Sequence, residues 1–277
     1  MRWGESSMNM YKIEIKNMLK SLLTWTIVMV GIISLFMAMF PSMSSSGMSE
    51  IVKTKLDAIP ESMRKSFGLS EAVDFSDLLQ YFAYTAQYIL IGNCIYAAIL
   101  GANSLIKEES EGTIEFLYAQ PISRFKIVLV KMLSTFTILY VFNIILFLVT
   151  MIFFEMFKES GYEYFMQLTL MYKGMFLAQF VFWALGFVLS AILPKVSLAT
   201  PTALGLFFIT YMLGMFSNII DKLHWMRYLS PVEYVMPSNV LKANGNIETN
   251  YILISLTITL VAILFTFFRY KTKDLKV

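Results

Sequence analysis

Six apolar segments, each long enough to cross a lipid bilayer, constrain this chain more than any other feature. A membrane-spanning helix needs about 20 predominantly apolar residues, and the segments lie at residues 21–40, 81–106, 127–154, 171–193, 197–217 and 251–268. Charged residues make up only 15% of the 277 residues, against about 25% in an average soluble domain. The sequence therefore predicts an all-α integral membrane protein, in which residues 1–277 form a single transmembrane domain.

The distribution of Lys and Arg predicts the orientation of these spans, because cytoplasmic loops carry an excess of both residues. If both termini are cytoplasmic, the inner segments hold 13 Lys and Arg in about 57 residues and the outer segments hold 9 in about 92. We therefore expect a multi-pass protein of the cell (plasma) membrane with both termini in the cytoplasm. Residues 107–126 then form a cytoplasmic loop, and residues 41–80 and 218–250 form extracytoplasmic loops.

Residues 8–20, just before the first span, have an amphipathic pattern. Apolar side chains recur there at helical spacing, and Lys12, Lys16 and Lys20 line another face. This pattern predicts a helix lying in the inner headgroup layer. The alternative is that these residues simply begin the first span and carry its flanking lysines.

Charged side chains are missing from the spans when Lys173 is counted with the outer loop and Lys131 with the inner loop, the alternative being that Lys131 lies inside the third helix. Charged groups inside a span cost about 2.5–3.5 kcal/mol each and usually mark ion or proton pathways. Their absence argues against a proton-driven pump, a sodium-coupled carrier and an intramembrane enzyme. Cys94 and His224 are the single cysteine and histidine, too few for a structural zinc site. We expect no catalytic residues, no metal site and, with a net charge of only +3, no nucleic-acid partner.

Uncharged polar side chains do occur within the predicted spans. They could hydrogen-bond between helices, or they could line a substrate path. These candidates are Gln87, Asn93, Asn103, Asn143 and Gln179.

The second span is rich in small residues. Ala97 with Gly101, and Ala98 with Ala102, form pairs four residues apart, a spacing that permits two helices to approach closely. The sequence leaves open whether this stripe packs within the chain or forms a dimer face.

The segment "KEESEGTIEFLYAQPISRFK", residues 107–126, is the densest acidic cluster in the chain. On a helix, Ile114, Leu117 and Tyr118 share one face, and Glu111 and Glu115 share another. This predicts a short amphipathic helix, held between two spans, that can dock on another protein; the alternative is a solvated loop. No G-x-x-x-x-G-K-[ST] phosphate-binding loop occurs in the sequence, so active transport would need a nucleotide-binding partner.

The run "EESEGTIEFLYAQPISRFKIVLVKML" resembles the signature of the type-2 ABC exporter permeases, of the bacterial type with a separate transmembrane subunit. That signature is an acidic-Gly-Thr-Ile/Leu-Glu run followed by a Pro-Ile/Val-Ser-Arg turn between the second and third spans. "IPESMRKSFGLS", "YLSPVEYV" and "FRYKTKDL" are similar to other parts of the family. The resemblance covers essentially the whole chain.

The resemblance implies six spans, an amphipathic N-terminal interfacial helix and two permeases side by side, of the same or different chains, in the membrane lipid. It implies two copies of an ABC ATPase subunit, which would bind ATP and Mg, and no cofactor on this chain. The 107–126 loop would be the coupling helix that docks on the ATPase. The resemblance implies that the residues of this loop that contact the ATPase are Glu108, Glu111, Gly112, Thr113, Ile114, Glu115, Phe116, Leu117, Pro121, Ser123 and Arg124.

The function implied is that of an ATP-driven exporter subunit for an amphipathic, lipid-like, peptide or drug cargo. Two other classes stay open at this point. The chain could be a membrane sensing or binding module with an ABC-like body and no transport. It could also be a passive channel or a secondary carrier.

Overall fold

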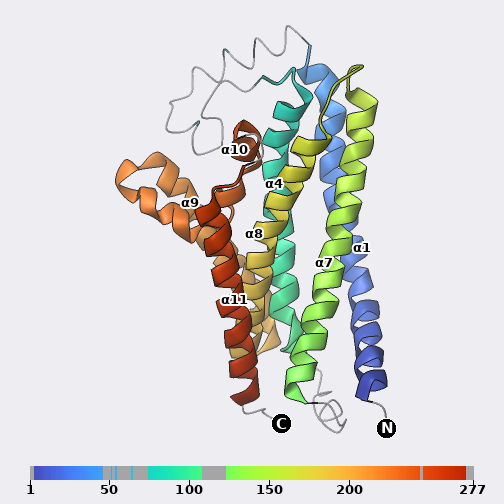
Figure 1. Cartoon of the computed structure of the whole chain (residues 1–277), viewed down its shortest axis with the longest axis vertical. Helices are drawn as coiled ribbons and strands as arrows, with labels where there is room; N and C mark the ends of the chain where they lie inside the picture. Colours follow the sequence, from blue (N-terminus) through green and yellow to red (C-terminus); the bar gives the residue numbers. More distant parts are fainter. Residues whose placement is uncertain are drawn as a thin grey trace.

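The computed structural model describes residues 3–45, 51, 54, 64, 74–107, 123–243 and 246–272; the side chains of residues 3–6 and 221 are not described. Six of its helices are long and apolar enough to cross a membrane, and they form an elongated bundle (Figure 1). The all-α class and the six spans are thereby confirmed. The elements are α1 Trp3–Met43, α4 Leu78–Ser104, α7 Arg124–Phe157, α8 Phe165–Ile192, η1 Val196–Leu198, α9 Ala199–Ile219, η2 Asp221–Leu229, η3 Glu233–Val235, α10 Pro237–Lys242 and α11 Thr249–Thr272.

Successive spans run in opposite directions, so the start of α1 and the end of α11 lie at the same end of the bundle (Figure 1). We call this the terminal end. The ends of α4 and α8 and the starts of α7 and α9 lie there too. Residues 107 and 123, which bound the acidic segment, are therefore at the terminal end.

Local signals in the sequence account for where several helices begin and end. The Asp77 carboxylate accepts a hydrogen bond from the Gln80 amide at 2.8 Å and caps α4, as a short acceptor side chain does at a helix start. Helix α8 ends at Ile192, just before Pro194. Leu193 adopts an extended backbone, as the residue before a proline tends to do.

Helices α4 and α8 form the centre of the bundle. In the most apolar 18-residue stretch of each span, 72% of the residues of α4 and 61% of those of α8 are buried, whereas the buried share is at most 33% in the other four. Gly101 of α4 and Gly186 of α8 permit this packing, because a Cβ on Gly186 would lie only 2.5 Å from the carbonyl oxygen of Ala98. The small-residue stripe therefore packs within the chain, against α8.

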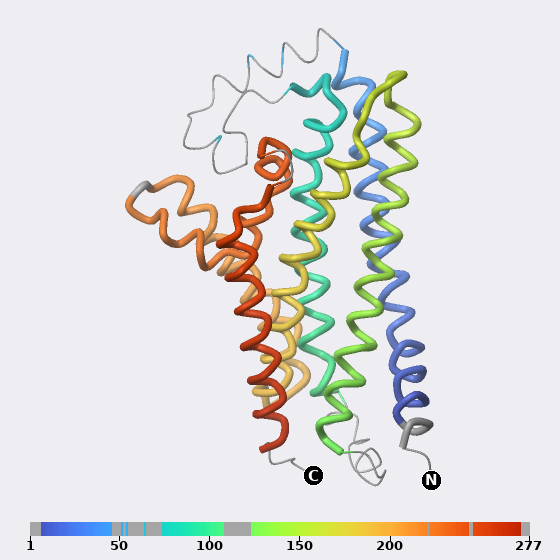
Figure 2. The backbone as a smooth tube through the Cα atoms, viewed as in Figure 1, coloured from blue at the N-terminus to red at the C-terminus, as the bar shows by residue number. Residues whose placement is uncertain are grey.

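Residues 8–20 continue without a break into the first span as part of α1. Figure 2 shows α1 beside α7, and the Tyr11 hydroxyl donates to Thr137 Oγ1 at 2.9 Å. The segment expected to lie in the headgroup layer is thus a direct extension of the spanning helix, and its Tyr11 side chain faces α7.

Residues 218–250 divide into two parts. The end of α9 and η2 project sideways from the bundle (Figure 2). The stretch from 230 to 237 is buried throughout, and Tyr234 stacks on Tyr251 at the start of α11, with 4.8 Å between ring centroids. This second part packs on the protein, although its aromatic pattern predicts a place in the outer membrane interface.

Candidate functional site

The predicted ATPase-contact segment joins α4 to α7 at the terminal end. Its central residues lie outside those that the structure describes: Glu108, Glu111, Gly112, Thr113, Ile114, Glu115, Phe116, Leu117 and Pro121. Ser123 and Arg124, at its end, are described. The structure therefore defines how the segment is anchored, and the contacts proposed for its centre remain predictions.

The end of the ATPase-contact segment is anchored where α7 begins. Ser123 caps this helix, with its hydroxyl accepting from the Lys126 amide at 3.4 Å. The Arg124 guanidinium donates to the carbonyl oxygens of Tyr270, at 3.4 Å, and Lys271, at 3.1 Å. The last carbonyls of a helix lack intrahelical partners and attract cations. Arg124 thus ties the start of α7 to the end of α11.

The start of the ATPase-contact segment is anchored where α4 ends. The Ser190 hydroxyl of α8 accepts from the amides of Leu105, at 2.8 Å, and Ile106, at 3.1 Å. Ser190 is fully buried, so this bond is shielded from competing water. The chain that enters the acidic segment is thereby held to the central helix α8.

Four of the five polar residues predicted within the spans take part in interhelical hydrogen bonds in two separate groups, and Gln87 lies apart from both. In the first, Asn143 Nδ2 of α7 donates to Gln179 Oε1 of α8, and Gln179 Nε2 donates to the Asn93 carbonyl of α4 at 3.3 Å. This row links three helices. The side-chain amide of Asn93 is fully buried and has no hydrogen-bond partner within the described part of the chain.

The second group lies nearer the terminal end. Asn103 Nδ2 donates to the Ile99 carbonyl at 2.8 Å and to Thr200 Oγ1 of α9 at 3.3 Å, which links α4 to α9. Gln87 is also buried, in the opposite half of α4. The structure therefore gathers Asn93, Asn143 and Gln179 and leaves Asn103 and Gln87 apart.

No group of three or more His, Cys, Asp and Glu side chains that could hold a metal ion is found in the part of the chain that the structure describes. Cys94 is free and buried. The described interior offers hydrogen bonding between helices and apolar surface.

A comparison with protein families matches residues 8–275 to the ABC-2 family transporter protein model. The chain belongs to the ABC-2 transporter family. A search of curated proteins found no match. Membership makes this chain a membrane permease subunit of an ABC transporter, and it implies an ABC ATPase as partner.

One residue of this ABC-2 permease had two alternative places in the sequence, the inner loop and the third helix, and the structure selects the helix. Lys131, counted there with the inner loop, lies two turns inside α7 and is only 2% exposed. Its Nζ lies 2.8 Å from Glu14 Oε1 of α1. One sequence signal pointed to this ion pair: Glu14 is the one acidic residue in the amphipathic stretch 8–20.

A second buried ionisable side chain of the permease lies in the segment between α9 and α11. Glu233 of η3 is 8% exposed, and its Oε1 accepts from Asn218 Nδ2 at 2.8 Å. Burial raises the pKa of this carboxyl group, against smaller opposing effects of the Asn218 bond and of nearby Arg227 and His224. Sequence reasoning missed Glu233, because the segment around "SPVEYV" was read for its aromatic residues and its family resemblance.

Proposed function

We propose that this ABC-2 permease is the transmembrane subunit of an ATP-driven exporter. Its terminal end faces the cytoplasm, and a separate ATPase docks on residues 107–126 through the apolar face and glutamates of that segment. Two permeases, of the same or different chains, and two ATPase subunits make up the complex. The cargo is amphipathic: lipid-like, a peptide or a drug.

The observation that carries this proposal is the double anchoring of the docking segment. Its entry is held to α8 by Ser190, and its exit is held to α11 by Arg124. A push on the segment therefore reaches four spans together: α4 and α7 through the chain, and α8 and α11 through hydrogen bonds. Since α4 and α8 form the centre of the bundle, such a push can repack the whole subunit.

The need for a partner follows from the chain itself. ATP-driven transport requires a phosphate-binding loop, and this sequence contains none. ATP and Mg therefore bind to the ATPase, and the permease converts movement of the docked segment into a change of access across the membrane.

Purification of the native complex tests the proposal. We expect an ABC ATPase to co-purify with the wild-type chain, and its ATP hydrolysis to depend on the permease. Leu117→Asp, and Glu111→Lys combined with Glu115→Lys, should abolish association, because they place a charge on the apolar face or reverse the sign of the acidic one. Lys222→Glu, an exposed change in η2, serves as the control.

The outcomes separate the candidate functions. Association that survives in both variants would contradict docking on this segment. Association with permease-dependent hydrolysis but no ATP-driven accumulation in inverted vesicles would favour the sensing module. Movement of solutes through the isolated chain without ATP would favour a channel or carrier.

A further inference from the structure

A pocket of about 190 Å³ lies between the start of α7 and the end of α11, at the terminal end of the bundle (Figure 1). Its walls are largely aromatic. Phe125 stacks on Phe267, with 4.7 Å between ring centroids, and Phe125 and Phe268 are 60% and 70% exposed. The lining residues are Arg124, Phe125, Phe267, Phe268, Tyr270 and Lys271. The pocket thus combines exposed aromatic surface with two cationic side chains.

The charged side chains of this pocket are both positive, and none of the described residues that line it is acidic. Arg124 donates to the carbonyl oxygens of Tyr270 and Lys271, and it thereby offsets the negative end of the α11 dipole. That helix end would otherwise repel an anion. The Lys271 side chain is exposed and has no hydrogen bond or ion pair with the described residues, so its charge is available to a ligand.

The position of the pocket along α11 places its charge and its rings at different depths in a membrane. Helix α11 has 24 residues, which corresponds to a length of about 36 Å. If α11 is centred on a hydrocarbon layer about 30 Å thick, Lys271 lies just outside that layer and Phe267 and Phe268 lie inside it. The positive charge is therefore at the level of lipid phosphates, and the aromatic walls are at the level of the acyl chains.

This arrangement matches an amphiphile with a negatively charged head. A soluble anion would pair with Lys271 but would leave the aromatic walls uncovered. A zwitterionic lipid would cover the walls but would bring its own ammonium group close to Arg124 and Lys271. Basic pockets between spans on the cytoplasmic side of a membrane recognise anionic headgroups.

We propose that this pocket binds an anionic phospholipid from the membrane leaflet at the terminal end. The phosphate of the lipid pairs with Lys271, and an acyl chain lies against Phe125, Phe267 and Phe268. The pocket adjoins the bond by which Arg124 ties α7 to α11, but lipid binding is a property of the permease alone. The proposal therefore does not depend on docking of an ATPase or on transport.

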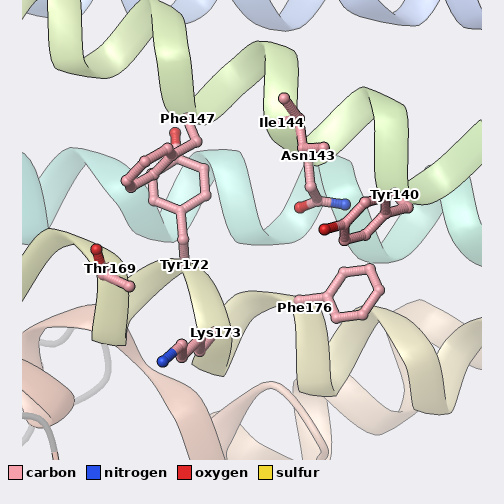
Figure 3. A pocket seen from close by; sticks show the side chains of 8 residues that line it. All are labelled: Tyr140, Asn143, Ile144, Phe147, Thr169, Tyr172, Lys173 and Phe176. Atoms are coloured by element: carbon pink, nitrogen blue, oxygen red, sulfur yellow. The ribbon is translucent and has the colours of Figure 1, made fainter.

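The groove between α7 and α8 offers a matched comparison. Figure 3 shows this groove, whose lining includes one lysine, Lys173, and the aromatic rings of Tyr140, Phe147 and Phe176. Lys173 is exposed and lies near the start of α8, in the opposite half of the bundle from Lys271. It has aromatic neighbours, as Lys271 does, but no second cation lines its groove among the described residues. Loss of Lys173 therefore serves as a control.

Native mass spectrometry of the purified full-length chain tests the proposal, with phosphatidylglycerol and phosphatidylcholine of identical acyl chains as the two probes. We expect one phosphatidylglycerol to bind at least about fivefold more tightly than phosphatidylcholine. Lys271→Gln should weaken phosphatidylglycerol binding about fivefold and remove most of this preference, because the cation that pairs with the phosphate is lost. Lys173→Gln should leave binding unchanged. So should Lys195→Gln, which removes an exposed lysine at the terminal end.

A second pair of variants tests the place of the acyl chain. Phe268→Ala should weaken binding of both lipids, and Phe265→Ala should not, because Phe265 is an exposed ring of α11 that does not line the pocket. Glycerol phosphate, a headgroup without acyl chains, should not displace the lipid.

Equal phosphatidylglycerol binding by the Lys271→Gln and wild-type chains, or an equal loss in Lys173→Gln, would overturn the proposal. Displacement of the lipid by glycerol phosphate would assign the site to soluble anions and would overturn it too. A photo-reactive residue at position 268 should capture phospholipid in native membranes. Capture of a second copy of the chain in place of lipid would contradict the proposal.

Discussion

Lys131 of α7 and Glu14 of α1 form an ion pair inside the bundle, with 2.8 Å between Nζ and Oε1. The two partners are unequally buried: the lysine side chain is 2% exposed and the glutamate side chain is 19% exposed. Removing one partner of a buried pair takes away part of what compensates the other charge, and the cost is greater for the more buried charge. The pair should therefore respond asymmetrically to mutation.

We expect Glu14→Gln to destabilise the permease by about 1.5–3 kcal/mol, because it removes a charge-assisted hydrogen bond from the more buried charge. Lys131→Gln should cost less, since Glu14 can still reach water, and the double variant should recover part of the loss. Thermal unfolding of the purified chain measures these effects. Lys158→Gln is the control, because the Lys158–Glu155 pair is largely exposed and should contribute less than about 0.5 kcal/mol. Equal losses in the two single variants would contradict this account.

Gly186 should not tolerate a side chain. An added Cβ would lie 2.5 Å from the Ala98 carbonyl oxygen and 2.9 Å from the Ala102 nitrogen, so Gly186→Ala must separate α4 from α8. We expect a loss of about 1–3 kcal/mol. At Gly205 of α9 no atom lies within 4 Å of an added Cβ, so Gly205→Ala should be neutral or stabilise α9 by up to about 1 kcal/mol. Similar melting temperatures for the two variants would count against close packing of α4 and α8.

The contrast between these glycines shows what the sequence could and could not predict. Hydropathy and length predicted the existence of six spans, because lipid demands long apolar helices. The small residues of α4 indicated a close contact, but its partner is set by how the helices assemble, and Gly186 carries no mark of it in the sequence. The burial of Lys131 was unpredictable for the same reason, because it depends on the extension of α1 beside α7.

The site was predicted less completely than the fold. The family motif pointed to Ser123 and Arg124, and the structure adds their hydrogen bonds. Ser190, which holds the other flank, stood in an apolar span with no motif around it.

The side-chain amide of Asn93 should destabilise the permease, and an apolar side chain at position 93 should remove this cost. Both polar atoms of its amide are buried without partners among the described residues, and each such group costs about 1–3 kcal/mol. Asn93→Leu, similar in size, should therefore raise the melting temperature. Asn143→Leu is the comparison: it should lower the melting temperature, since Gln179 would lose its donor. A destabilised Asn93→Leu chain would indicate a polar contact that the monomer lacks.

Glu233 should make the stability of the permease depend on pH. Burial raises the pKa of this carboxyl group in the folded chain above its ordinary value, which is the value expected in the unfolded chain. At a pH between the unfolded-state pKa and the folded-state pKa, the folded chain therefore binds more protons than the unfolded chain. Stability then falls as pH rises through this window. Thermal unfolding measured from pH about 4 to about 8 should show this slope in the wild type and not in Glu233→Gln. The exposed change Glu163→Gln should retain the wild-type slope; a slope that persists in Glu233→Gln would assign it to other groups.

The central claim, that an ATPase docks on residues 107–126, is tested most directly by site-specific photo-crosslinking in native membranes. A photo-reactive residue at position 117 should form an adduct with an ABC ATPase. The same residue at position 129, where Leu129 is 39% exposed on α7, should form none. An ATPase adduct from 117 alone is the result we predict. Absence of an adduct at 117, with the ATPase captured from 129 or not at all, would contradict the account.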